Sequence, residues 1–78
     1  PNPFNSTTRI AFQLPYPSHV NLSIRDQQGR EVTVLLNQNL TLGKHEVRWQ
    51  ADDQPSGMYF CTMDANGFRI SKGVVFVR

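Results

Sequence analysis

Few residues in this chain carry side chains that catalysis or metal binding commonly uses. Two histidines, His19 and His45, and a single cysteine, Cys61, could in principle supply a nucleophile and its base. Cys61 and His45 fall on positions expected to point inward, where packing is the usual role of a thiol. Zinc requires three or four ligands at close spacing, which these residues do not provide. We therefore expect no enzyme activity, no zinc site and no cofactor.

A calcium site is a second kind of chemistry to consider. Asp52 and Asp53, or Asp64 with Asn66, could offer oxygen ligands from neighbouring loops. The same residue types are also the common formers of turns. Because turn formation explains all four residues, we expect no bound metal.

Aromatic side chains could instead bind a sugar by stacking. Trp49, Tyr16 and Tyr59 would be the platform of such a site. However, Trp49 alternates in phase with Val47, and Tyr59 alternates in phase with Cys61, so both aromatic rings are expected in the core. Tyr16 is then the one aromatic expected on the surface, and a single ring is not a platform.

Length and composition indicate one small folded domain over residues 1–78. The charged fraction of 18% is too low for a disordered tail, and the apolar fraction of 38% can form a modest core. The basic residues are scattered singly and the formal net charge is +2, which argues against nucleic-acid binding. No apolar run approaches the roughly 20 residues of a membrane span, so we expect no membrane insertion.

Alternation of apolar and polar residues predicts an all-β chain. The expected strands cover residues 8–14, 20–25, 31–36, 45–50, 58–63 and 68–77. Gly73 is expected to mark a bulge or bend that divides the last run, for six or seven strands in all. This pattern is typical of an antiparallel β-sandwich of immunoglobulin-like or fibronectin type.

Turn residues predict how these strands are connected. Residues 26–29 and 66–67 each carry a glycine suited to a hairpin turn. Residues 37–43 are expected to form a polar loop from which Leu40 and Leu42 tuck under the sandwich.

The phase of the apolar residues predicts which side chains face the core. In the third strand, Val32, Val34 and Leu36 share one face. For the C-terminal hairpin the expected core residues are Tyr59, Cys61, Ile70, Val74 and Phe76.

Four blocks of this sequence resemble a known family in their order along the chain. The blocks are Pro1-Asn2-Pro3-Phe4-Asn5, Gly29-Arg30-Glu31, Pro55-Ser56-Gly57-Met58-Tyr59-Phe60, and Lys72 before an apolar run closed by Arg78. Together they are similar to the C-terminal sorting domains of the type IX (Por) secretion system, which themselves resemble flagellar hook-capping immunoglobulin-like domains. The resemblance covers essentially the whole chain.

The resemblance implies a secretion signal without catalysis of its own. A signal peptide elsewhere on the precursor would take the protein to the periplasm, where an outer-membrane translocon would recognise the folded domain. A sortase-like cysteine peptidase would then remove it, and the cargo would be released or attached to the cell surface. The implied partners are therefore the translocon, the peptidase and an N-terminal cargo domain of the same precursor. The domain alone is expected to be a monomer.

The same resemblance marks individual positions for recognition. These positions are Pro1, Asn2, Pro3, Phe4, Gly29, Arg30, Glu31, Gly57, Tyr59, Lys72 and Arg78. Each has a purely structural interpretation as well. Glycines serve backbone conformation, Tyr59 serves the core, Arg30 and Glu31 form an exposed pair, and Lys72 deters edge pairing by a terminal strand.

Two other functions remain compatible with a small β-sandwich. The first is a passive or carbohydrate-binding module appended to a secreted glycan-degrading enzyme. The second is an assembly scaffold of the hook-capping kind. Exposed aromatic residues would favour the first, and self-association would favour the second.

Overall fold

The structure, a computed structural model, describes residues 7–51 and 53–77. These residues form six β-strands and no helix, which confirms the predicted all-β fold. The strands are β1 Thr7–Leu14, β2 Ser18–Arg25, β3 Glu31–Leu40, β4 Gly43–Gln50, β5 Gly57–Ala65 and β6 Phe68–Phe76. No helix that could span a membrane is found in this part of the chain.

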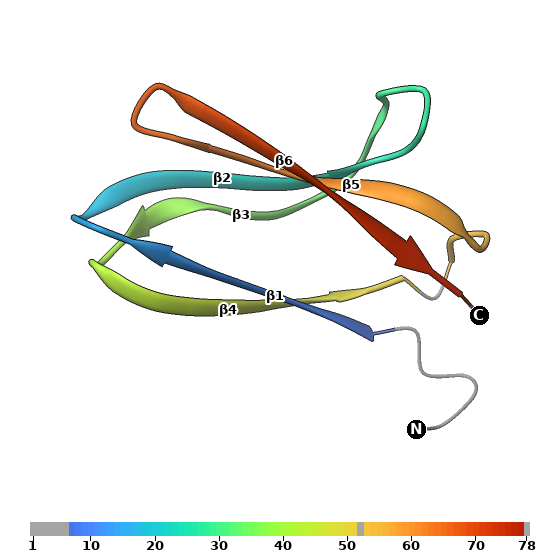
Figure 1. Cartoon of the computed structure of the whole chain (residues 1–78), viewed down its shortest axis with the longest axis horizontal. Coiled ribbons are helices and arrows are strands. Elements are labelled where there is room, and N and C mark those ends of the chain that lie inside the picture. Colours follow the sequence, from blue (N-terminus) through green and yellow to red (C-terminus); the bar gives the residue numbers. More distant parts are fainter. Residues whose placement is uncertain (1–6, 52, 78) are drawn as a thin grey trace.

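The strands form two antiparallel sheets that face each other (Figure 1). The small sheet contains β1 and β4, and the large sheet has the order β3-β2-β5-β6. Both predicted hairpins are present, β2 with β3 and β5 with β6, and the pairing of β2 with β5 joins them into one sheet. The chain therefore leaves the small sheet after β1 and returns to it for β4.

The core lies between the sheets and is built from alternate residues of the strands. Val20, Leu22 and Ile24 of the central strand β2 are fully buried. Around one end of the core the rings of Trp49, Tyr59 and Phe76 pack together, with centroids 5.1 to 6.2 Å apart. Trp49 and Tyr59 are thus core residues, as their phase predicted, and Tyr16 is exposed.

Strand β3 departs from the expected alternation. Its register against β2 shifts twice, between the partners of Leu22 and Ser23 and between those of Ile24 and Arg25. Each such bulge inserts one residue and reverses which side chains face inward. Val34 is consequently 43% exposed, so its predicted place in the core is wrong, whereas Leu35 packs against the core.

The expected polar loop after the third strand is shorter than predicted. Strand β3 continues through Leu40 because residues 37–40 pair with the first half of β2. Leu40 packs against the core, as expected, but from within a strand. Leu42 lies in the tight connection to β4 and is 62% exposed, so the prediction that it tucks under the sandwich is wrong.

Strand β6 is one continuous strand, without the predicted bulge or bend at Gly73. Gly73 lies opposite Phe60 in regular register, and a Cβ atom there would come within 3.2 Å of the Met58 sulfur. The side chains of Met58 and Phe60 therefore occupy the space that the missing side chain leaves.

The first half of β6 lies outside the core. Figure 1 shows the start of β6 well away from the small sheet and its end close to it. Ile70 is 58% exposed, so its predicted burial is wrong, while Val74 packs against the core and Phe76 is buried. A two-stranded sheet is too narrow to cover the full width of a four-stranded one.

Candidate recognition surface

The turn between β2 and β3 takes its shape from Gly29. The Gly29 N–H donates to the Asp26 carbonyl and the Asp26 N–H donates to the Arg30 carbonyl, both at 3.0 Å. Gly29 itself has a φ of +84°, in the left-handed region that favours glycine. This is a three-residue hairpin loop that ends in a glycine bulge. The structural interpretation of Gly29 is therefore supported directly.

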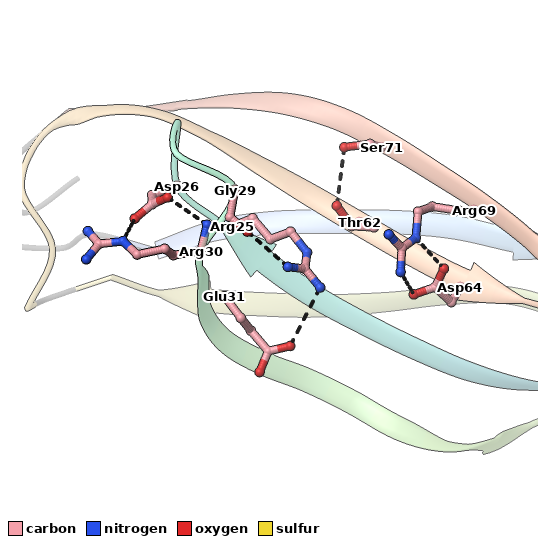
Figure 2. A network of polar contacts seen from close by, with 9 residues as sticks. All are labelled: Arg25, Asp26, Gly29, Arg30, Glu31, Thr62, Asp64, Arg69 and Ser71. Atoms are coloured by element: carbon pink, nitrogen blue, oxygen red, sulfur yellow. Dashed lines mark hydrogen bonds and ion pairs between the residues drawn. The ribbon is translucent and has the colours of Figure 1, made fainter.

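The Asp26 side chain fixes the same turn. Its carboxylate accepts hydrogen bonds from the backbone N–H groups of Gln28 and Arg30 and from the Arg30 Nε, each at 2.9 Å. Figure 2 shows the contacts between Asp26 and Arg30. Partial burial of the carboxyl acts to raise its pKa, but the Arg30 hydrogen bonds and charge outweigh burial and hold the pKa of Asp26 below its ordinary value. The carboxylate thus stays ionised and keeps the turn closed.

Arg25 supports the turn from the outer face of the large sheet. Its Nη1 donates to the Gly29 carbonyl at 3.0 Å, and its Nη2 lies 3.9 Å from the Glu31 Oε1 (Figure 2). Arg30 and Glu31 therefore have separate partners, Asp26 and Arg25, and do not form the expected pair with each other. The Arg30 side chain is 80% exposed, so most of its guanidinium surface is available for contact.

The loop before β5 is held by Tyr59. The Tyr59 hydroxyl donates to the Pro55 carbonyl at 2.6 Å, while its ring packs edge-on against Trp49 in the core. A tyrosine near the start of a strand that bonds back to the preceding backbone is the arrangement called a tyrosine corner in immunoglobulin-like sandwiches. Tyr59 is thus a core residue that positions residues 55–57.

Gly57 lacks the conformational reason that holds at Gly29. Its φ is not in the left-handed region, and a Cβ atom there would meet nothing within 4 Å. The interpretation that Gly57 serves backbone conformation is therefore not supported. Because Gly57 has no side chain, the surface beside Met58 is open at this position.

The turn and the loop meet at one end of the molecule. A shallow concavity of about 280 Å³ lies between them, and Figure 1 shows both segments at the end where β6 finishes. Its walls are formed by Asp26, Gln27, Gln28, Arg30, Gln54, Pro55, Ser56, Gly57, Met58 and Tyr59. Two sequence blocks separated by strands β3 and β4 thus form a single surface, which we call the turn–loop surface.

Lys72 lies apart from the turn–loop surface. It is paired with Cys61 in the middle of β6, on the face that points toward the small sheet, and its side chain is exposed. Within residues 7–51 and 53–77, no ion pair involves Lys72. A charged, inward-pointing residue on an edge strand is a known way to deter unwanted strand pairing.

The remaining marked residues, Pro1, Asn2, Pro3, Phe4 and Arg78, lie outside the described residues.

The residues considered for catalysis have separate local partners. The two ring nitrogens of His19 lie 2.8 Å from the amide oxygens of Asn37 and Asn39, and His45 Nε2 donates to the Thr41 carbonyl at 2.7 Å. Burial raises the pKa of the Cys61 thiol. In the described part of the chain, no group of three or more potential ligands could hold a metal ion.

Sequence reasoning missed the residues that shape the site. Asp26 and Arg25 hold the turn, and Pro55 receives the Tyr59 hydroxyl, yet none of them was marked as a site residue. The aspartate at the start of the turn was the available signal, because aspartate commonly bonds to the backbone two residues further on. Nothing in the spacing indicated that the turn would lie beside the loop before β5.

The described residues define a small antiparallel β-sandwich with a shallow concavity at one end, which three of the marked residues, Arg30, Gly57 and Tyr59, help to line. Residues 1–77 match the model of the family described as secretion system C-terminal sorting domain, and the chain therefore belongs to that family. The resemblance noted in the sequence is thus confirmed. No curated protein and no solved structure matched the chain.

Membership defines what the chain does in general terms. It is a type IX secretion C-terminal sorting signal, part of a cargo precursor handled by the type IX machinery and destined for the cell surface or the extracellular space. The family is one of sorting signals and is not known for catalysis.

Proposed function

We propose that residues 1–78 fold as one domain and act as a non-catalytic secretion signal read by an outer-membrane translocon. The precursor reaches the periplasm, the translocon recognises the folded domain, and a sortase-like cysteine peptidase then removes it. The cargo is released or attached to the cell surface. The observation that carries this proposal is the family match over residues 1–77.

We assign recognition to the turn–loop surface. Arg30 offers exposed charge there, and Gly29 and Tyr59 hold the two segments that carry the surface. Glu31 follows Arg30 directly, outside the lining of the concavity, and would add to recognition from beside it. Arginine is common at the energetic centre of protein interfaces, and such centres combine it with apolar area. Met58 lines the concavity, and its outward-facing neighbours Phe60 and Val75 are also exposed, which supplies that apolar area.

We assign the other marked residues a supporting part in recognition. Lys72 contacts the translocon outside the turn–loop surface, and Arg78 and the lead-in Pro1-Asn2-Pro3-Phe4 take part in recognition as well. Truncation of the C-terminus is a poor test of this assignment, because Phe76 belongs to the core and its loss would unfold the domain. Lys72→Ala is the better test, because the exposed Lys72 side chain can be removed without loss of packing.

The direct test is export of a reporter. A reporter protein that reaches the periplasm by its own signal peptide is fused to residues 1–78 in a host with a type IX system. The reporter should then appear outside the cell, and the reporter without the domain should stay in the periplasm. Retention of the fusion in the periplasm, with the domain folded, would refute the proposal.

A carbohydrate-binding function receives no support from the aromatic residues. Trp49 and Tyr59 are buried in the core, so the platform considered for them with Tyr16 does not form. Phe60 and Phe68 are also exposed, so the expectation that Tyr16 is the one aromatic on the surface is wrong. The scaffold alternative would require self-association of the domain.

A further inference from the structure

The two sheets leave a slot between their edge strands β1 and β6. Within the described residues, β1 pairs with β4 alone and β6 pairs with β5 alone. Each strand therefore has one backbone edge whose N–H and C=O groups face away from its partner. Exposed strand edges of this kind are templates for pairing with another chain.

The slot is apolar and reaches down to the core. Its volume is about 210 Å³. Its walls and floor are formed by Arg9, Ile10, Ala11, Phe12, Leu22, Cys61, Met63, Ile70, Lys72 and Val74. A buried cavity of about 150 Å³ can hold a benzene molecule, so this slot has room for one or two apolar side chains.

The rim of the slot carries two cationic side chains, Arg9 and Lys72. Arg9 forms an ion pair with Glu46. Lys72 lies between Ile70 and Val74 on the same face of β6, and in the described part of the chain it has no acidic partner. A ligand in the slot would therefore bind more tightly if it placed a carboxylate opposite Lys72.

We propose that this slot binds an extended segment of another polypeptide, with apolar residues at alternate positions and a carboxylate in phase with them. The segment adds to the free edge of β6 as a fifth strand of the large sheet. Residues opposite each other on neighbouring strands have Cβ atoms about 5 Å apart, so the carboxylate meets Lys72 while the apolar side chains enter the slot. This mode of binding is β-strand addition, in which backbone hydrogen bonds give affinity and side-chain pockets give specificity. It does not rest on the sorting function.

The chain contains a natural reporter for this test. Cys61 is the single cysteine and lies on the floor of the slot, so its rate of reaction with a small thiol reagent reports on occupancy. Two capped nine-residue peptides are compared, each with valine at alternate positions and threonine between. One peptide has glutamate at the central valine position, and the other has lysine there.

The glutamate peptide should slow the reaction of Cys61 and slow hydrogen exchange along residues 68–76. It should bind at least about threefold more tightly than the lysine peptide, and Lys72→Glu should reverse that preference. Lys44→Glu is the matched control, because Lys44 is an exposed lysine of β4 outside the slot, and it should leave the preference unchanged.

Three results would overturn the proposal. The first is that neither peptide protects Cys61. The second is that Lys72→Glu leaves the preference unchanged. The third is that, without any peptide, Cys61 becomes protected as the protein concentration rises and sedimentation shows a dimer. A second copy of the chain would then be the occupant of the slot.

Discussion

At the scale of single residues, the marked positions differ in what the fold requires of them. Gly29 is needed for a left-handed backbone, and Tyr59 links the core to the loop before β5. A Cβ atom at Gly57 would meet no neighbouring atom, and the exposed side chains of Arg30 and Lys72 can be truncated with little loss of packing, although Arg30 also pairs with Asp26. The second group is therefore where recognition can be tested without damage to the fold.

The Tyr59 hydroxyl should contribute measurably to stability. Tyr59→Phe keeps the ring in the core but removes the hydrogen bond to the Pro55 carbonyl. We expect the free energy of unfolding to fall by about 1 kcal/mol, which corresponds to roughly 4–8 °C in Tm for a domain of this size. Tyr16→Phe is the control, because Tyr16 is exposed, and thermal unfolding of this variant should match the parent. Equal Tm values for all three proteins would contradict the role given to Tyr59.

Substitution by alanine should lower the stability of the domain at Gly29 but leave it nearly unchanged at Gly57. Gly29→Ala places a Cβ atom on a residue with a φ of +84° and should cost about 1–2 kcal/mol. Gly57→Ala meets neither strain nor a neighbouring atom, so its stability should stay within about 0.5 kcal/mol of the parent. Urea denaturation of the two variants measures both values. A comparable loss of unfolding free energy in the two variants would show that the backbone at position 57 requires glycine.

At the scale of elements, β6 combines a core half and an exposed half. Phe76→Ala removes a buried ring that contacts Trp49 and Tyr59, and it should cost about 3–5 kcal/mol, enough to unfold much of a small domain. Ile70→Ala should change stability by less than about 1 kcal/mol, because Ile70 is mostly exposed. Thermal melting followed by circular dichroism measures the stability of the two variants. A large loss for Ile70→Ala would contradict the placement of this half outside the core.

The sequence predicted the strands and both hairpins because alternation and turn residues are local signals. The sequence-based predictions were wrong at positions whose burial depends on contacts between distant strands. The bulges that expose Val34 depend on the register between β2 and β3, and the exposure of Ile70 depends on the width of the facing sheet. Neither is encoded in the phase of a single strand.

The candidate site was predictable in its parts but not in its assembly. The glycine turn and the inward phase of Tyr59 were visible in the sequence, and the family blocks marked both. Their convergence follows from the pairing of β2 with β5, which brings the end of one strand beside the start of the other. That pairing joins residues far apart in the chain, and no local pattern specifies it.

At the scale of the whole molecule, several carboxylates tie stability to pH. A hydrogen bond from Arg9 lowers the pKa of Glu46, and one from Arg69 lowers the pKa of Asp64, in each case against a smaller effect of burial. At Asp26 burial is the largest single effect and acts to raise the pKa, but the hydrogen bonds and charge of Arg30 together with the Gln28 N–H outweigh it, so this pKa is lowered too. These groups are ionised in the folded protein at a lower pH than in the unfolded chain.

Stability should therefore fall in acid. Each carboxylate contributes stability that is fully present above its ordinary pKa, 3.8 for Asp26 and Asp64 and 4.5 for Glu46, and that is lost as the pH falls through the lower folded value. Urea midpoints measured from about pH 5 down to about pH 2 should decrease, and Asp64→Asn should reduce the slope. A flat profile over this range would contradict the lowered pKa values.

His19 should act in the opposite direction near neutral pH. Hydrogen bonds to Asn37 and then to Asn39 raise its pKa above the ordinary value of 6.5. Its contribution is present below that value and is lost as the pH rises through the folded pKa. Maximal stability is thus expected between the acid range of the carboxylates and the range in which His19 deprotonates.

The central claim is that the turn–loop surface is what the export machinery reads. Figure 2 places two comparable ion pairs toward opposite ends of the large sheet, Arg30 with Asp26 in the turn and Arg69 with Asp64 far from it. Both arginines are mostly exposed, and an exposed ion pair contributes less than about 1 kcal/mol, so alanine at either position should keep the fold.

The most direct measurement is the exported fraction of the reporter fusion carrying each variant, with folding checked by thermal melting. Arg30→Ala should lower the exported fraction severalfold, and Arg69→Ala should leave it unchanged. Export of the Arg30→Ala fusion at the level of the parent, or equal loss from both folded variants, would contradict recognition through the turn–loop surface.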